Sequence, residues 1–209
     1  MAKLESSFKN MLLSLLFISA GMSAALGFVY TLTKGPIEIA NKQKEVQAIK
    51  EVLPAFDNDP TANVQSIEGL DYYVATNQGQ AAGFAVKTFT DKGFSGKFTL
   101  MVGFKTDGSI NKISVLDQKE TPGLGTKMKE PKFSKQFLDK NPATFTLKVK
   151  KDGGQVDAIT AATISSRAYC DAVQKAYNGY LENLKGKENP IISDSIVPDT
   201  TNLSKGGQK

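Results

Sequence analysis

A run of 22 residues without a charged side chain, Met11 to Leu32, constrains the fold of this chain more than any other feature, and Lys9 and Lys34 bracket it. A helix needs about 20 apolar residues to cross the hydrocarbon core of a bilayer. A cleaved signal peptide, the alternative, has an apolar core of only about 7 to 15 residues. The run therefore predicts a retained transmembrane anchor at 11–33, after a short N-terminal segment at 1–10.

The lysines around this run do not decide the orientation of the anchor. Two precede it and four follow it closely: Lys3 and Lys9, then Lys34, Lys42, Lys44 and Lys50. This count favours a cytoplasmic main domain, but large domains that follow a span translocate largely regardless of such charges. The side of the membrane therefore stays open on charge alone.

Composition limits the chemistry that the side chains can perform. The 209 residues give room for one ordinary domain besides an anchor and a tail, and they include no histidine and one cysteine, Cys170. Histidine-dependent triads, disulfides within the chain and thiolate metal clusters are thereby excluded. The net charge of +5 comes from scattered lysines without a clustered basic motif, so no nucleic-acid partner is expected. A bound cofactor is the favoured source of reactivity.

Residues 34–60 have the pattern of an amphipathic connecting helix. Proline is allowed in a first helical turn, and from Pro36 onward apolar residues recur at close to heptad spacing, at Ile39, Val46, Ile49 and Leu53. The segment from Pro54 to Pro60 ends the pattern. A dimeric coiled coil is the weaker interpretation because fewer than three clean heptads are present.

Residues 61–186 are the predicted folded domain. Runs rich in aromatic and β-branched residues predict strands at 72–75, 82–89, 98–104 and 110–116. Turn signals at Asn77-Gln78-Gly79 and Asp107-Gly108 favour hairpins, and hence an antiparallel sheet. A short helix at 130–140, with Phe133, Phe137 and Leu138 on one side, and a strand at 144–149 are predicted to follow.

A long amphipathic helix is predicted to close the domain. It runs to about Leu184, and its apolar stripe consists of Tyr169, Ala172, Val173, Ala176, Tyr180 and Leu184. Residues 187–209 are polar and predict a poorly ordered tail. The predicted fold class is α+β, in which an N-terminal transmembrane helix is followed by an antiparallel sheet packed with helices.

Directly before that helix lies the run Asp157-Ala158-Ile159-Thr160-Ala161-Ala162-Thr163-Ile164-Ser165-Ser166. Its small residues let the backbone approach a ligand closely. Thr163 falls where the helix should begin, so its hydroxyl would cap free N–H groups, and the same groups would attract an anion such as phosphate. An ordinary capped helix start is the alternative, and the run taken alone favours it.

Two further strings accompany this run: Glu120-Thr121-Pro122-Gly123-Leu124-Gly125 and Gly93-Phe94-Ser95-Gly96-Lys97-Phe98. In order and rough spacing, the three resemble the FMN-binding domains of the RnfG and NqrC subunits of bacterial membrane redox complexes, whose motif reads Asp-x-x-(Ser/Thr)-Gly-Ala-Thr. The resemblance implies that Thr163 carries FMN covalently through a phosphoester, with Asp157 and Thr160 at other marked positions. Ala161 stands where the family has glycine, and Ala162 follows it.

The Glu120 loop is expected to contact the flavin ring. Pro122 stiffens it, and its glycines allow backbone N–H groups to turn toward a planar ligand. Phe94 and Ser95 are weaker candidates, since their loop would equally serve only to shape the sheet. A tight turn without a ligand is the alternative for the Glu120 loop. The assigned ring contacts are Thr121, Gly123, Leu124 and Gly125, with Glu120 holding the loop or bonding the ring edge.

The resemblance implies an electron-transfer subunit of an ion-translocating ferredoxin:NAD oxidoreductase (Rnf) complex, with the other membrane and redox subunits as partners. It also implies a flavin transferase, helped by Asp157, for maturation, and single-pass insertion in the cytoplasmic (inner) membrane with the flavin domain outside. An NqrC-like subunit of a Na⁺-translocating NADH:quinone oxidoreductase ranks second, because those chains usually run longer. A membrane-anchored module that binds a phosphate or a partner without redox activity is the alternative from another class. A stand-alone flavin reductase is not favoured, because the chain has no NAD(P)H glycine fingerprint.

Overall fold

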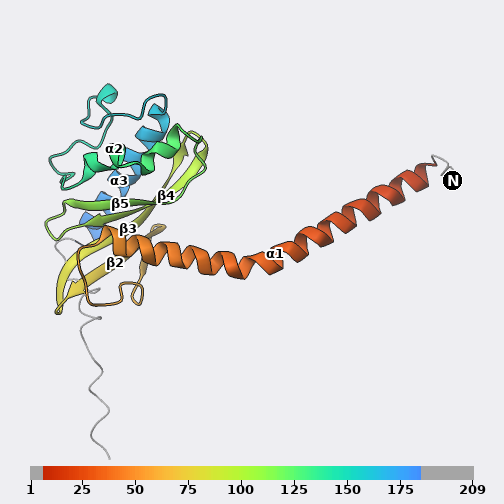
Figure 1. The fold of residues 1–209 in the computed structure, drawn as a ribbon, viewed down its shortest axis with the longest axis horizontal. Helices are drawn as coiled ribbons and strands as arrows, with labels where there is room; N and C mark the ends of the chain where they lie inside the picture. Colours follow the sequence, from red (N-terminus) through yellow and green to blue (C-terminus); the bar gives the residue numbers. More distant parts are fainter. Residues whose placement is uncertain (1–6, 185–209) are drawn as a thin grey trace, which may run out of the picture. The chain divides into compact units, whose positions relative to one another are not determined.

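The computed structural model describes residues 7–184, and its first element is the long helix α1, Phe8–Val52 (Figure 1). By length and composition this helix is able to cross a membrane, and its apolar window is 0% buried by the rest of the structure. The chain divides into two compact units between Lys44 and Glu45. The apolar window and the last two turns of α1 therefore belong to different units.

Pro36 lies inside α1, so the prediction that it begins a separate helix is wrong. Proline removes one backbone donor, but its fixed φ is close to the helical value. The residues on both sides continue the helix, which ends at Val52, just before Pro54.

The tail predicted at 187–209 lies outside the described residues.

Five antiparallel strands form one meandering sheet in the order β1-β2-β3-β4-β5 (Figure 1). Their bounds are Gln65–Ile67, Leu70–Asn77, Gln80–Gly93, Gly96–Phe104 and Ile110–Asp117. The antiparallel sheet is confirmed, with its four longer strands each extending beyond the predicted range. The short β1 was not predicted, because three residues are too few to show an alternating pattern. Gln78 and Gly79 have positive φ, 53° and 77°, as a two-residue hairpin turn requires.

Side chains alternate between the two faces of the sheet, as strand geometry requires. Tyr72, Phe98 and Phe104 point to the face covered by the final helix α3, Thr163–Asn183. The apolar stripe predicted on that helix is confirmed, since all six of its residues are buried: Tyr169, Ala172, Val173, Ala176, Tyr180 and Leu184. The sheet and α3 thus enclose the main hydrophobic core.

The opposite face of the sheet is covered by the end of α1. Ala48, Ile49 and Val52 of α1 pack there against Tyr73, Ala75, Ala85 and Met101. Gly103 allows this close approach, because a Cβ added there would lie 2.0 Å from the Val52 carbonyl oxygen. The last turns of α1 are therefore part of the folded domain.

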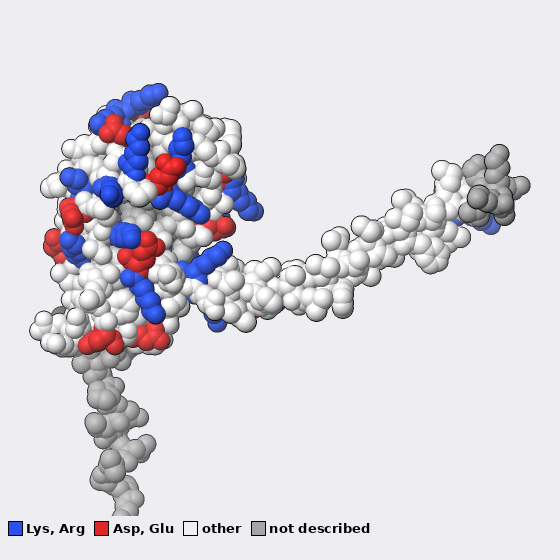
Figure 2. All heavy atoms as spheres, in the orientation of Figure 1, with Lys and Arg blue, Asp and Glu red and all other residues white. Residues whose placement is uncertain are grey.

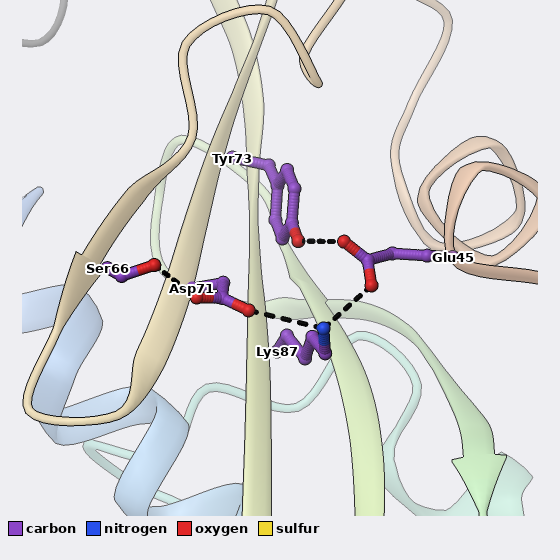
Figure 3. Close-up of polar contacts among 5 residues, drawn as sticks. All are labelled: Glu45, Ser66, Asp71, Tyr73 and Lys87. Atoms are coloured by element: carbon purple, nitrogen blue, oxygen red, sulfur yellow. Dashed lines mark hydrogen bonds and ion pairs between the residues drawn. The ribbon is translucent and has the colours of Figure 1, made fainter. Parts of the chain in front are cut away.

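A polar network joins α1 to the sheet beside this second core (Figure 3). Glu45 accepts hydrogen bonds from the Tyr73 hydroxyl and from Lys87 Nζ, the latter at 2.7 Å. Lys87 Nζ also lies 3.2 Å from the Asp71 carboxylate, which accepts a hydrogen bond from Ser66. The network thus links α1 with β1, β2 and β3.

The segment between the sheet and α3 is less regular than predicted. In place of one helix at 130–140 it contains the 3₁₀ turn η1, Gly125–Lys129, the short helix α2, Pro131–Ser134, and the 3₁₀ turn η2, Lys135–Phe137. Phe133 and Phe137 are buried as predicted, whereas Leu138 is half-buried.

The strand predicted at 144–149 is wrong. Val149 makes only an isolated bridge with Val156, and the 3₁₀ turn η3, Lys150–Asp152, follows. Leu147 and Val149 are buried in the main core. A short apolar run that is buried by packing has the same pattern as a strand.

Candidate functional site

Glu120 brings three segments of the domain together. Its side chain is buried, and Oε1 accepts a hydrogen bond of 3.2 Å from the backbone N–H of Ser95, in the hairpin between β3 and β4. Oε2 accepts one of 2.9 Å from the hydroxyl of Ser165, in the first turn of α3. A buried carboxylate is costly unless it is hydrogen-bonded. These bonds therefore fix the hairpin, the Glu120 loop and the start of α3 relative to one another, which favours the loop-holding role predicted for Glu120.

Two glycines allow the loops to approach this carboxylate. A Cβ added at Gly93 would lie 2.7 Å from Glu120 Oε1, and one at Gly125 would lie 2.6 Å from Oε2. The same Cβ at Gly125 would lie 2.9 Å from the Ser165 hydroxyl. Both glycines thus serve close packing around Glu120, since a packed interior has no room for an added methyl group.

A pocket of about 310 Å³ opens beside the Glu120 carboxylate. The hairpin, the Glu120 loop and the start of α3 line it, through Phe94, then Glu120, Thr121, Leu124 and Gly125, then Ala161, Ala162, Thr163, Ile164 and Ser165. Phe94 is 67% exposed, Ile164 49% and Leu124 39%. Apolar walls with a few placed polar groups suit a planar organic ligand.

The start of α3 leaves one hydroxyl and several N–H groups available. Ala162 is the N-cap and no side chain caps the helix, so the prediction that Thr163 is the cap is wrong. The Ser166 hydroxyl donates to the Ala162 carbonyl and accepts from the Ile159 N–H, each at 2.9 Å, while Ser165 donates to Glu120. Within residues 7–184 the Thr163 hydroxyl has no hydrogen-bond partner. The first N–H groups of a helix, when uncapped, attract an anion.

Ala161 has the left-handed backbone conformation, with φ of 61°. This conformation favours glycine, because Cβ then comes close to the following carbonyl oxygen. The turn that leads into α3 therefore gives a backbone reason for a glycine at this motif position, and the alanine adds strain.

Asp157 and Thr160 lie outside this pocket. They line a neighbouring pocket of about 160 Å³, together with Lys127 and Lys132. The Asp157 carboxylate pairs with Lys150 Nζ at 2.7 Å. The backbone of Asp157 is fixed by the Gln136 amide, whose Nε2 donates to its carbonyl at 3.1 Å and whose Oε1 accepts from its N–H at 2.7 Å.

The structure thus gathers most of the predicted site residues in one place. Ser95 takes part through its backbone N–H, and Gly123, with φ of 74°, serves the turn of the loop. Ile164 and Ser165 line the pocket but were not assigned to it from the sequence, although they directly follow Thr163 in the motif run. Gln136 gave no sequence signal, because its partner lies 21 residues away.

The residues present fit an FMN phosphoryl group and one edge of its ring. The uncapped turn of α3 offers donors for the phosphoryl oxygens, and the loop and hairpin offer apolar and backbone contacts for the ring. Burial raises the pKa of the Cys170 thiol to about 12, which keeps this residue protonated and unreactive. The site is therefore built for holding a cofactor.

Comparison with known proteins agrees with this geometry. Residues 93–178 match the family described as FMN-binding domain. The G subunit of the ion-translocating oxidoreductase complex of Methanosarcina acetivorans is 35% identical over 174 residues, which cover 80% of this chain and 91% of that protein.

Two further relatives match over a similar extent. The protein of the same name from Vibrio cholerae is 32% identical over 87% of this chain and 95% of its own length. The G subunit of the Na⁺-translocating ferredoxin:NAD⁺ oxidoreductase complex of Acetobacterium woodii is 32% identical over 80% of this chain and 89% of its own length. The resemblance predicted from three short strings is thereby confirmed. The chain belongs to the family of G subunits of ion-translocating oxidoreductase complexes, and its residues 93–178 match the FMN-binding domain.

Proposed function

We propose that this chain is an electron-carrying subunit of a membrane-bound, ion-translocating ferredoxin:NAD oxidoreductase complex, and that it holds FMN by a phosphoester bond to Thr163. Family membership supports the carrier role, and the relative from Acetobacterium woodii is named as belonging to such a complex. The state of the Thr163 hydroxyl carries the covalent part of the proposal. It lines the pocket beside an uncapped helical turn and has no hydrogen-bond partner among the described residues, whereas Ser165 and Ser166 are both engaged.

The residues of the chain bind and orient the cofactor, and FMN supplies the redox chemistry when it is bound. Backbone N–H groups in the first turn of α3 would hold the phosphoryl oxygens, next to the oxygen of Thr163 that bonds the phosphorus. Thr121, Leu124 and Gly125 would contact the ring. Glu120 belongs to the ring-contacting loop and accepts a hydrogen bond from Ser165 in the phosphate-binding turn. It would therefore keep the loop and the turn at a fixed separation.

We further propose that a separate flavin transferase recognises Asp157 and transfers the FMN moiety of FAD to the Thr163 hydroxyl; the pyrophosphate bond of FAD breaks and AMP leaves. The Asp157 side chain is exposed and lies in the segment that leads to Thr163, while Gln136 fixes its backbone. Asp157→Asn keeps the shape of the side chain and removes its charge. We expect this variant to fold normally and to be flavinylated more slowly.

In-gel flavin fluorescence tests covalent attachment. The chain is co-expressed with a flavin transferase and run on a denaturing gel, where only covalently bound flavin stays with the protein. Wild type should give a fluorescent band that is absent in Thr163→Ala and present in Ser134→Ala, a control hydroxyl in α2. Mass spectrometry of the Thr163 peptide should show the mass of the FMN phosphoester. A dark wild-type band would instead favour a membrane-anchored binding module.

We also propose that the flavin domain lies outside the cytoplasmic membrane. The single cysteine, Cys170, is 2% exposed, so a surface cysteine added elsewhere reports its own accessibility. Ala62→Cys lies in an exposed loop of the domain, and Ser7→Cys lies before the apolar span. In intact cells a membrane-impermeant maleimide should label Ala62→Cys and spare Ser7→Cys until the cells are permeabilised. The reverse pattern would place the domain in the cytoplasm.

A further inference from the structure

The segment that forms one side of the candidate flavin pocket has a net positive charge. The 17 residues from Lys119 to Lys135 contain five lysines and two glutamates, a net charge of +3, against +5 for the whole chain. One of these glutamates, Glu120, is buried. We call the five lysines the lysine surface: Lys119, Lys127, Lys129, Lys132 and Lys135.

The lysine surface keeps a net positive charge, although Glu130 and Asp157 line the smaller pocket together with Lys127 and Lys132. None of its five members makes an ion pair with another residue of the described chain. Some basic residues elsewhere do so: Lys34, Lys87, Lys92, Lys105, Lys112, Lys150 and Arg167. A group of like charges without internal partners creates a positive potential at the surface, and this potential attracts a negative one.

The lysine surface adjoins the pocket directly. Lys127 and Lys132 line the smaller pocket together with Thr160, and the next residue, Ala161, lines the flavin pocket. The turn η1, which carries Lys127 and Lys129, begins at Gly125, which also lines the flavin pocket. Figure 2 shows basic side chains, with acidic ones between them, over the part of the domain where Figure 1 places α2.

We propose that the lysine surface, together with the exposed side chains of Phe94, Leu124 and Ile164, is the docking face for an acidic surface on another redox subunit. The inference rests on the proposed carrier function. An apolar centre with a charged rim is the usual anatomy of a protein interface, and charges on the rim orient a partner and speed its approach. A partner with carboxylates around its own cofactor would be seated with that cofactor facing the pocket. A lipid surface in this place would cover the pocket.

Carbodiimide cross-linking of the purified complex tests this docking face, because it joins a lysine to a carboxylate only where the two are in contact. Mass spectrometry should find Lys127 or Lys132 joined to Asp or Glu of another subunit. These links should disappear in Lys127→Gln/Lys132→Gln. They should persist in Lys50→Gln/Lys151→Gln, which removes the same charge from two exposed lysines elsewhere. A complex in which neither Lys127 nor Lys132 is linked to another subunit overturns the proposal.

Lysine acetylation distinguishes a protein partner from a membrane. The full chain is labelled alone in phosphatidylcholine nanodiscs, alone in nanodiscs with added phosphatidylglycerol, and in the complex. Protection of Lys127 and Lys132 from acetylation only in the complex supports the proposal. Protection of these lysines in the isolated chain when phosphatidylglycerol is present overturns it in favour of a lipid contact. Neither cross-linking nor acetylation needs bound flavin. A Thr163→Ala chain that is not flavinylated but still cross-links would therefore show that docking is independent of the carrier function.

Discussion

At the scale of single residues, two hydrogen bonds and two close glycine contacts meet at the Glu120 carboxylate. Glu120 and Ser165 are 45 residues apart in the chain. Their bond therefore couples the ring-contacting loop to the turn that carries Thr163. Substitution of either Glu120 or Ser165 should disturb both the ring-contacting loop and the turn that carries Thr163.

We expect Ser165→Ala to lower the free energy of unfolding by about 1–3 kcal/mol, because it leaves a buried carboxylate oxygen without its partner. Glu120→Ala should cost a similar amount. The double variant should cost clearly less than the sum, since the two residues share one interaction. Urea unfolding of the full chain in detergent, followed by circular dichroism, measures these values. Ser134→Ala, at a half-buried serine outside the site, is the control. Strict additivity of the two single changes would contradict the coupling.

Substitution of Ala161 by glycine should raise stability, in contrast to the substitutions at Glu120 and Ser165. Because its φ is 61°, Ala161→Gly should raise the free energy of unfolding by up to about 1 kcal/mol, through relief of left-handed strain. Gly153 has φ of 79° and nothing near its Cβ position. Gly153→Ala should therefore lower stability by about 1 kcal/mol through the backbone alone. A destabilising Ala161→Gly would contradict the strain at this turn.

At the scale of elements, the end of α1 depends on the network of Glu45, Tyr73 and Lys87 (Figure 3). Burial first, and then the hydrogen bond to Glu45 and its charge, raise the pKa of Tyr73 well above its ordinary value. For Lys87, burial lowers the pKa, but the hydrogen bonds and charges of Glu45 and Asp71 outweigh it, so that the pKa is raised. Both groups therefore hold their protons more tightly in the folded chain than in the unfolded one.

The sign of the pH dependence follows from these two shifts. Stability from both groups is present below the unfolded pKa values, 10.0 for tyrosine and 10.5 for lysine, and is lost as the pH rises above them. Tyr73→Phe should therefore show a smaller loss of stability between about pH 10 and pH 12 than wild type. Glu45→Gln should flatten the same region only in part, because it removes a charge that contributes to both raised pKa values, while burial still raises the pKa of Tyr73. Urea midpoints measured across this range decide the matter, and an unchanged slope in Tyr73→Phe would show that the network does not titrate with folding.

At the scale of the whole molecule, the boundary between the two units falls inside α1. The apolar stretch that is able to cross a membrane and the segment that covers the second face of the sheet are consecutive parts of one helix. The domain therefore includes residues from Glu45 onward.

A chain that begins at Lys44 should fold, since it keeps Glu45, Ile49 and Val52. A chain that begins at Pro54 should unfold or aggregate, because it exposes the face that carries Tyr73 and Met101. The loss of Ile49 and Val52 alone removes about 1.5–3 kcal/mol each of apolar burial. Circular dichroism and size-exclusion chromatography of the two chains provide the comparison. A stable, monomeric chain from Pro54 would show that the end of α1 is dispensable.

The sequence by itself determined the apolar span, the four longer strands, the stripe on α3 and the family, since each depends on local periodicity or on a contiguous string of residues. It did not determine the short β1, the continuity of α1 through Pro36, or the irregular packing of Leu147 and Val149. These features depend on neighbours distant in the chain. The tertiary structure alone decided that Ser165 and Ser95 meet at Glu120, that Gln136 fixes Asp157, and that the lysine surface adjoins the pocket. The physical reason is that hydrogen bonds and surface potentials depend on distance in space, which a pattern along the chain does not record.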